Sequence, residues 1–196
     1  MWASPVSLTG SHVAVAPLSQ NHAVDLAQAA ADGALHRLWY TSVPPPAAVP
    51  DEINRRLSLL EAGSMVPFAI LDRSGKAVGM TTYMNIDHAN RRLEIGSTWY
   101  RKAVQRGPLN TECKLLLLTH AFETLNAIAV EFRTHFMNQQ SRRAIERLGA
   151  KLDGILRSHM IMADGSLRDT AVYSITAAEW PAVRSNLRWK LDQPRG

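Results

Sequence analysis

The feature that most constrains this sequence is a leucine-rich run of helical periodicity near its middle. Between Asn110 and Asn126, apolar residues recur at steps of three and four, namely Leu115, Leu118, Phe122 and Leu125. An apolar stripe of this kind has to be buried against a second layer of structure. Because strand-like segments precede and follow the run, we predict that the helix lies on a sheet.

Segments rich in β-branched and aromatic residues supply that sheet. Turn dipeptides separate several of these segments and predict hairpins. The predicted strands are His12–Leu18, Arg91–Tyr100 and Ala129–Phe136, with one hairpin over residues 67–84 that turns at Ser74-Gly75 and a second that joins residues 151–162 to residues 168–176 through Asp164-Gly165.

Further helices are predicted on both sides of the central run. Asn138 is a favourable N-cap residue and Gly149 a favourable C-terminal stop, so a helix is expected over Asn138–Leu148. The other predicted helices are Asn21–Ala31, Asp51–Glu61 and a final helix from about Ala177 with Pro181 in its first turn. The proline-rich stretch Thr41–Pro50 is expected to be a loop. The element order β-α-α-β-β-β-α-β-α-β-β predicts a mixed α/β (α+β) fold.

Length and composition indicate one globular domain. The chain has 196 residues, of which 46% are hydrophobic and 20% charged, and this suits a single core rather than two. The longest aliphatic run, Leu115–Leu118, is too short to span a membrane, and the N-terminus lacks a signal-peptide pattern. A single cysteine, Cys113, allows no internal disulfide, so we expect a cytoplasmic protein.

The formal net charge of +5 is compatible with a polyanionic partner. Scattered, solvated lysine and arginine side chains explain the excess equally well. No aromatic RNA-binding motif, zinc knuckle or GXXG loop is present, which argues against a nucleic-acid partner.

Several common catalytic motifs are missing from the sequence. Ile70 occupies the position of the first glycine of a P-loop ahead of Gly75-Lys76, and no HExxH, GxSxG or GxGxxG motif occurs. We therefore expect no metal site, and nucleotide hydrolysis and triad hydrolysis are disfavoured.

A glycine-containing turn between the strand Arg91–Tyr100 and the leucine-rich helix remains as the best candidate site. Residues 105–110 read Gln-Arg-Gly-Pro-Leu-Asn and lead directly into the helix. A helix N-terminus has unpaired N–H groups and partial positive charge, which suit a pyrophosphate. An ordinary loop capped by Asn110 would have the same sequence features.

A second element strengthens the anion-site interpretation. Asn138-Gln139-Gln140-Ser141 begins a helix that ends at Gly149, about thirty residues after the turn and across one strand. With this arrangement the chain resembles the GNAT superfamily of N-acetyltransferases over about Val13 to Trp180. Within it, the chain looks most like the RimJ/RimL-type branch, which includes ribosomal-protein N-terminal acetyltransferases, and the stretches that carry this are residues 110–118, 120–123, 157–160 and 164–170.

The resemblance implies a fold and a cofactor. The fold would be a mostly antiparallel sheet of about six to seven strands flanked by helices, with a splayed central strand pair that binds coenzyme A. The chain would form one domain over residues 1–196, with a core of about 12–180 and a C-terminal tail of about 181–196. The cofactor would be acetyl-CoA. Its expected ligands are Ile95, Gly96, Ser97, Thr98 and Trp99 for the pantetheine arm, Gln105, Arg106, Gly107, Leu109, Asn110 and Thr111 for the pyrophosphate, and Asn138 and Arg143 on the later helix.

The resemblance also implies catalytic roles. Many GNAT enzymes protonate the departing thiolate with a tyrosine seven residues after the helix-starting asparagine, and here that position is Ile145. Ser141 is the expected substitute. Glu94 is the candidate base or water-orienting group, although a solvated strand residue or an ion pair with Arg91 or Arg92 would equally explain a glutamate there.

The acceptor would be an amine, either a protein N-terminus or a small molecule. His36, Trp39 and Tyr40 would line its side of the site, and buried aromatic packing is the alternative for these residues. Two other functions stay open: a non-catalytic module that binds acyl-CoA, which the absent tyrosine favours, and a ribosome-associated protein that uses its basic surface. A homodimer also stays open.

Overall fold

The computed structural model describes residues 2–41 and 43–193. Ser42, in the predicted loop Thr41–Pro50, and residues 194–196 of the predicted tail lie outside the described residues. The described strands form an eight-stranded sheet in the order β1-β2-β3-β4-β5-β6-β8-β7. Its strands are β1 (Leu8–Thr9), β2 (Ala14–Pro17), β3 (Met65–Leu71), β4 (Ala77–Asp87), β5 (Arg92–Tyr100), β6 (Ala129–His135), β7 (Lys151–Ile161) and β8 (Leu167–Thr176).

The sheet is mostly antiparallel, as predicted, and only the β5–β6 pair is parallel. All seven predicted strands are present, with boundaries that differ by a few residues. The additional strand, β1, is two residues long and pairs with β2. A strand of two residues shows no periodicity, so the sequence pattern could not reveal it.

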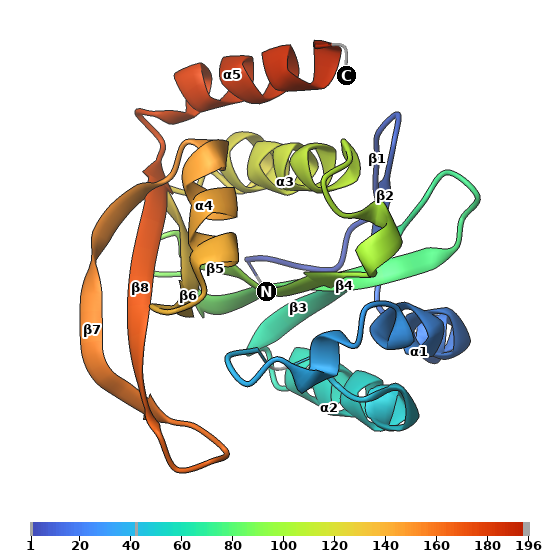
Figure 1. The fold of residues 1–196 in the computed structure, drawn as a ribbon. Coiled ribbons are helices and arrows are strands. Elements are labelled where there is room, and N and C mark those ends of the chain that lie inside the picture. Colours follow the sequence, from blue (N-terminus) through green and yellow to red (C-terminus); the bar gives the residue numbers. More distant parts are fainter. Residues whose placement is uncertain (1, 42, 194–196) are drawn as a thin grey trace.

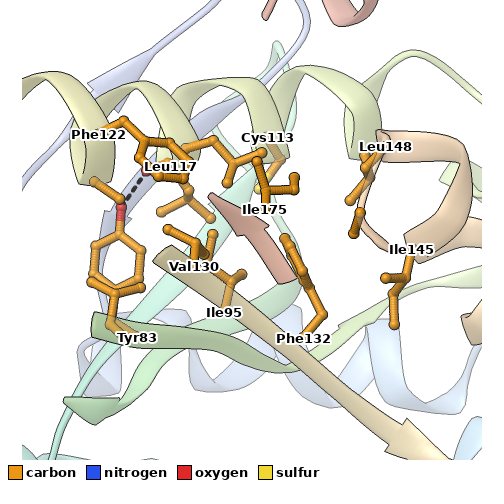
Figure 2. Close-up of a cluster of buried hydrophobic side chains, with 14 of the residues drawn as sticks. Tyr83, Ile95, Cys113, Leu117, Phe122, Val130, Phe132, Ile145, Leu148 and Ile175 are labelled. Carbon is orange, nitrogen blue, oxygen red and sulfur yellow. Dashed lines mark hydrogen bonds between the residues drawn. The ribbon is translucent and has the colours of Figure 1, made fainter. Parts of the chain in front are cut away.

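Helices cover both faces of the sheet (Figure 1). Buried residues of α3 (Leu109–Thr119), α4 (Gln139–Leu148) and α5 (Trp180–Asp192) share one core with the sheet. Buried residues of α1 (Ala23–Ala31) and α2 (Val49–Glu61) form a second core on the other face. The leucine-rich helix therefore lies on the sheet, as its periodicity predicts, and Figure 2 shows Leu117 and Cys113 of α3 above Val130 and Ile175 of the strands.

Helix α2 begins earlier than predicted. A short 3-10 turn over Pro46–Ala48 leads into α2 at Val49, so the C-terminal part of the predicted loop Thr41–Pro50 is helical. Proline is compatible with a first helical turn because the N–H group that it lacks would have no intrahelical partner there. Because Pro50 is typical of a loop as well as of a first helical turn, the sequence pattern predicts a start at Asp51, two residues later than the observed start at Val49.

The leucine-rich segment also differs from a plain helix. Regular α3 ends at Thr119 and continues as a π-helical turn over His120–Thr124. The hydroxyl of Tyr83 on β4 donates a hydrogen bond of 2.6 Å to the carbonyl of Leu117 (Figure 2). The buried face includes Leu117, Leu118 and Phe122, whereas Leu115 and Leu125 are only partly buried.

Strands β5 and β6 separate after a short paired segment. Their pairing covers Arg92–Glu94 on β5 and Ala129–Glu131 on β6. On the other side of β5, the register with β4 shifts between Thr82–Gly96 and Met80–Trp99, which marks a bulge in β5. This local geometry opens the centre of the sheet.

Within the described residues, no helix is both long and apolar enough to cross a membrane.

Candidate active site

The candidate site begins where β5 and β6 part. Within the described part of the chain, β5 has no strand partner on its β6 side from Ile95 onward. Its backbone N–H and C=O groups there are available to an extended ligand, which could bind as an additional strand does. The five residues predicted to bind the pantetheine arm, Ile95, Gly96, Ser97, Thr98 and Trp99, make up this segment.

The bulge in β5 places Ser97 in an unusual conformation. Ser97 is exposed and has a φ angle of 46°, in the left-handed region that non-glycine residues seldom adopt. On the neighbouring strand, a Cβ atom at Gly79 would lie 2.2 Å from the carbonyl oxygen of Trp99. Gly79 therefore permits the close approach of β4 to the bulged strand.

The turn before α3 has the features of an anion site. Pro108 is the N-cap residue, and the first turn closes with a hydrogen bond of 3.0 Å from Glu112 N–H to the Pro108 carbonyl. The N–H groups of Leu109, Asn110 and Thr111 precede this bond, so the helix itself provides no acceptor for them. A cleft of about 490 Å³ adjoins the turn and is lined in part by Gln105, Gly107 and Leu109.

Asn110 does not cap α3, as it would if the turn were an ordinary loop. It lies inside the first turn of α3, and its Oδ1 atom is buried without a hydrogen-bond partner among the described residues. An unpaired buried polar atom is costly and is often found where a ligand or water completes the bonding. The Asn110 oxygen can accept a hydrogen bond from an N–H or O–H group of a ligand or from water. The N–H groups of the first turn and the adjoining cleft suit a phosphate.

The charged residues around the turn are largely engaged in holding it. Arg101 Nε and the N–H of Ala103 both bind the carboxylate of Asp32 at 3.0 Å. Glu112 points away from the turn and accepts hydrogen bonds from the N–H groups of Ser11 and His12 at 2.8 and 2.6 Å. A glutamate in the first turn of α3 is thus compatible with an anion site, because its carboxylate is used elsewhere.

Helix α4 points its N-terminus toward the same opening of the sheet. Asn138 Oδ1 accepts a hydrogen bond of 3.0 Å from Ser141 N–H, so Asn138 caps α4 as predicted. Within the described residues its side-chain NH2 donates no hydrogen bond, which leaves it for a ligand. Arg143 is exposed on α4. Ile145, seven residues after Asn138, is buried in the core beside Phe132 (Figure 2).

Glu94 is a buried acid at the strand opening. The residue is 4% exposed and accepts a hydrogen bond of 2.7 Å from Asn85 Nδ2. Burial raises the pKa of the Glu94 carboxyl, while Asn85 and the guanidinium of Arg133 act to lower it. A buried carboxyl with a raised pKa at a strand opening is a suitable general base.

The ion pairs expected for Glu94 are wrong in detail. Glu94 pairs with Arg133 on β6 at 3.6 Å, and not with Arg91 or Arg92. Arg92 instead binds Glu131 at 2.6 Å. Parallel pairing places Glu94 opposite Glu131, so the arginine two positions further along β6 lies on the same face as Glu94.

Aromatic residues of the α1–α2 connection reach the end of β6. The Trp39 ring is 56% exposed and contacts the His135 ring edge-on, with centroids 4.9 Å apart, and the Tyr40 ring packs against Trp39. His135 Nδ1 accepts a hydrogen bond from Met137 N–H, and its Nε2 is buried without a partner among the described residues. The Nδ1 of His36 is likewise buried and unpaired. Trp39 and Tyr40 thus border the strand opening on the face opposite α3.

Sequence reasoning missed four polar residues of this region: Asn85, Lys114, Arg133 and His135. Lys114 had a detectable signal, because it precedes Leu117 and Leu118 by three and four residues and so shares their buried face. Asn85, Arg133 and His135 had none, since their neighbours depend on strand register.

Comparison with known proteins agrees with this geometry. The family model for the acetyltransferase (GNAT) domain matches residues 12–151. A Bacillus subtilis protein named as a ribosomal N-acetyltransferase, YdaF, is 33% identical over 107 residues, which is 54% of this chain and 57% of that protein. The matched region thus spans a little over half of that relative.

Solved structures extend the agreement to nearly the whole chain. A GCN5-related N-acetyltransferase from Brucella melitensis superposes with a TM-score of 0.88 and 31% identity, over 97% of this chain and 87% of that one. Mycobacterium smegmatis RimJ in complex with CoA-disulfide has a TM-score of 0.80 at 22% identity, over 95% of both chains, and so shares the fold.

Proposed function

Because this chain belongs to the GNAT acetyltransferase family and is an acyltransferase, we propose that it transfers an acetyl group from acetyl-CoA to an amine. One observation carries the proposal: strands β5 and β6 separate after Glu94 and Glu131, and along the chain β5 leads to the turn before α3 and β6 to the capped start of α4. The proposal treats residues 1–196 as one acetyltransferase domain, since Ala3 and Leu187 are fully buried in the same core as the sheet.

In the proposed complex, three parts of the chain hold the cofactor. The N–H groups of Leu109, Asn110 and Thr111, with Gln105, Arg106 and Gly107 of the turn, bind the pyrophosphate. The backbone of Ile95–Trp99 binds the pantetheine arm on its open side. The Asn138 side-chain NH2 donates to the same arm, and Arg143 lies on the outer side of α4. The CoA in the Mycobacterium RimJ complex supports this cofactor class through the shared fold.

Bound acetyl-CoA supplies an acyl group activated as a thioester. In the proposed reaction, Glu94 takes a proton from the acceptor amine, directly or through water, so that the nitrogen attacks in its neutral form. N–H groups at the β5 bulge bind the carbonyl oxygen as it gains charge. Ser141, in the first turn of α4, orients the sulfur.

The proposed acceptor enters from the face of Glu94, bordered by His36, Trp39 and Tyr40. An α-amine suits this site, because its ordinary pKa of about 7.7–8.0 is far closer to neutrality than that of a lysine side chain at about 10.4. The name of the Bacillus relative refers to N-acetylation at the ribosome, and among the amines of a ribosomal acceptor we propose a protein N-terminus. A non-catalytic acyl-CoA-binding role is the second candidate, and the buried Ile145 is the observation that favours it.

A turnover assay separates the two candidates. Release of the CoA thiol is followed with acetyl-CoA and a panel that contains N-terminal peptides, lysine-side-chain peptides with blocked N-termini, and small amines. The proposal expects turnover with an α-amine. Saturable CoA binding without turnover on any amine would instead support the binding module, and absence of CoA binding would contradict both.

A further inference from the structure

Lys114 is a buried cation beside the point where β5 and β6 part. It lies on the sheet-facing side of α3, with 5% of the residue exposed. Its ammonium donates hydrogen bonds to Thr98 Oγ1 on β5 at 2.8 Å and to Thr81 Oγ1 on β4 at 3.4 Å. The same nitrogen lies 6.0 Å from the centre of the Phe132 ring on β6. Both Thr98 and Phe132 follow the last paired residues, so the charge is located between the separating strands.

This charge has no close counter-ion. Within the described residues, Lys114 forms no ion pair, and its polar contacts are the two threonine hydroxyls. The titratable groups that act on it are Cys113 on α3 and Glu94 on β5. Burial lowers the pKa of the Lys114 ammonium to about 8, and these two groups only partly oppose that change.

The fold does not require the ammonium. The hydroxyls of Thr81 and Thr98 lie 2.7 Å apart and hydrogen-bond to each other, so removal of the lysine leaves neither one unpaired. A buried ammonium without a counter-ion carries a cost of desolvation, so an apolar side chain of similar size at this position should not weaken the fold. The lysine is therefore better explained by a ligand than by packing.

We propose that Lys114 stabilises and protonates the thiolate that leaves when the thioester is cleaved, in place of the tyrosine that Ile145 replaces. The inference rests on the proposed function, because it requires the pantetheine arm to lie along β5 beside Thr98. Ser141 is uncharged and a weak acid, so it can orient the sulfur but neutralises it poorly. A buried ammonium supplies both a charge and a proton.

The amine nitrogen bonds to the acyl carbon, the carbon–sulfur bond breaks, and its electron pair goes to sulfur. Lys114 transfers one proton from its ammonium to the sulfur. Glu94 passes to solvent the proton that the acceptor ammonium loses before attack. It then accepts the second proton, which the nitrogen loses as the amide forms, and passes that to solvent as well. Lys114 regains one proton from solvent before the next turnover.

Titration of the bound CoA thiol tests the inference without turnover. Wild-type protein, Lys114→Met and the control Lys151→Met are saturated with CoA, and thiolate absorbance in the ultraviolet is followed as pH rises. Lys151 is an exposed lysine of β7, with 75% of its side chain accessible, so its replacement removes the same charge outside the strand opening. The thiol is expected to ionise about 1–3 pH units lower in wild type and Lys151→Met than in Lys114→Met.

Steady-state kinetics and melting temperature complete the test. Lys114→Met is expected to lower kcat at least ~100-fold, the usual range for loss of a general acid. In wild type, kcat should fall above about pH 8, as the Lys114 ammonium loses its proton, and Lys114→Met should lack this fall. The melting temperature of Lys114→Met should be unchanged or raised. Identical thiol titrations and equal kcat in Lys114→Met and wild type would overturn the role of Lys114 alone. A wild-type protein that binds no CoA would overturn the proposed function as well.

Discussion

Asn85 on β4 donates a hydrogen bond of 2.7 Å from its side-chain amide to the carboxylate of Glu94 on β5. The two residues lie beside the opening of the sheet, and a Cβ atom at Gly96 would come within 2.5 Å of the Glu94 carboxylate. Glu94 is thus fixed in orientation by a neighbouring side chain and by a glycine that leaves space for it. A residue held in this way is organised to act at one point of the site.

Replacement of Glu94 by glutamine should separate activity from stability. Glu94→Gln is expected to lower kcat/KM by ~10²–10⁴-fold, because the proposed general base is lost. Burial raises the folded-state pKa of Glu94 above its ordinary value, so the neutral form stabilises the fold at low pH and that contribution is lost as pH rises through the folded pKa. At neutral pH a permanently neutral glutamine should keep or raise the free energy of unfolding, measured by urea denaturation. A variant equally stable and fully active would contradict the base assignment.

The pH dependence of wild-type kcat/KM provides a second check on Glu94. Activity should fall as pH drops through the raised pKa of this carboxyl, so the acid limb is expected above the ordinary glutamate value of 4.5. The limb due to Glu94 should be absent from the residual activity of Glu94→Gln, which should follow only the titration of the acceptor amine. The exposed Glu61 at the end of α2 is the control, since Glu61→Gln should leave the profile unchanged.

Asn138 allows its capping and binding roles to be tested separately. Asn138→Asp keeps an oxygen that can accept from Ser141 N–H but loses the side-chain NH2. We expect stability near wild type and a KM for acetyl-CoA raised by ~2–10-fold, the value of one lost hydrogen bond. Asn138→Ala loses both groups and should also destabilise the protein by about 1 kcal/mol. Equal KM values in Asn138→Asp and wild type would exclude the amide from cofactor binding.

Glu112 is expected to be structural. Its carboxylate accepts two N–H groups of the β1–β2 turn, at 2.8 and 2.6 Å, and bonds to a charged group contribute roughly 1.5–3 kcal/mol. Glu112→Ala should therefore lower the free energy of unfolding by about 2–4 kcal/mol, less than the sum of two such bonds, because Ser11 is exposed and His12 half-buried, so that water can reach the freed N–H groups. Glu61→Ala at an exposed position is the matched control and should change it by less than about 0.5 kcal/mol. No loss of stability in Glu112→Ala would show that the turn does not depend on it.

The sequence predicted the elements of the fold well because their signals are local. Periodicity identified the strands and helices, and Asn138 and Gly149 marked both ends of α4 correctly. Its errors occurred where local signals are weak or ambiguous. Pro50 suits both a loop and a first helical turn, β1 is too short to show a pattern, and the buried face of α3 is set by contacts such as that of Tyr83 with Leu117.

The backbone parts of the site were predictable, whereas its side-chain contacts were not. The turn before α3, the strand Ile95–Trp99 and the start of α4 follow from motifs of fixed spacing. The pairing of Glu94 with Arg133 depends on the register between β5 and β6. In that register Glu94 pairs with Glu131, 37 positions later in the chain, and no local sequence pattern specifies this alignment. The contacts of Lys114 likewise require three strands and one helix to be placed together.

The central claim is that the opening between β5 and β6, with the first turn of α3, binds coenzyme A. Isothermal titration calorimetry of the wild-type protein with CoA, repeated with dephospho-CoA and pantetheine, measures this directly. We predict saturable binding of one CoA per chain, with weaker binding of pantetheine, because pantetheine lacks the pyrophosphate that the α3 turn holds. Failure to bind CoA, or equal affinity for CoA and pantetheine, would contradict the account.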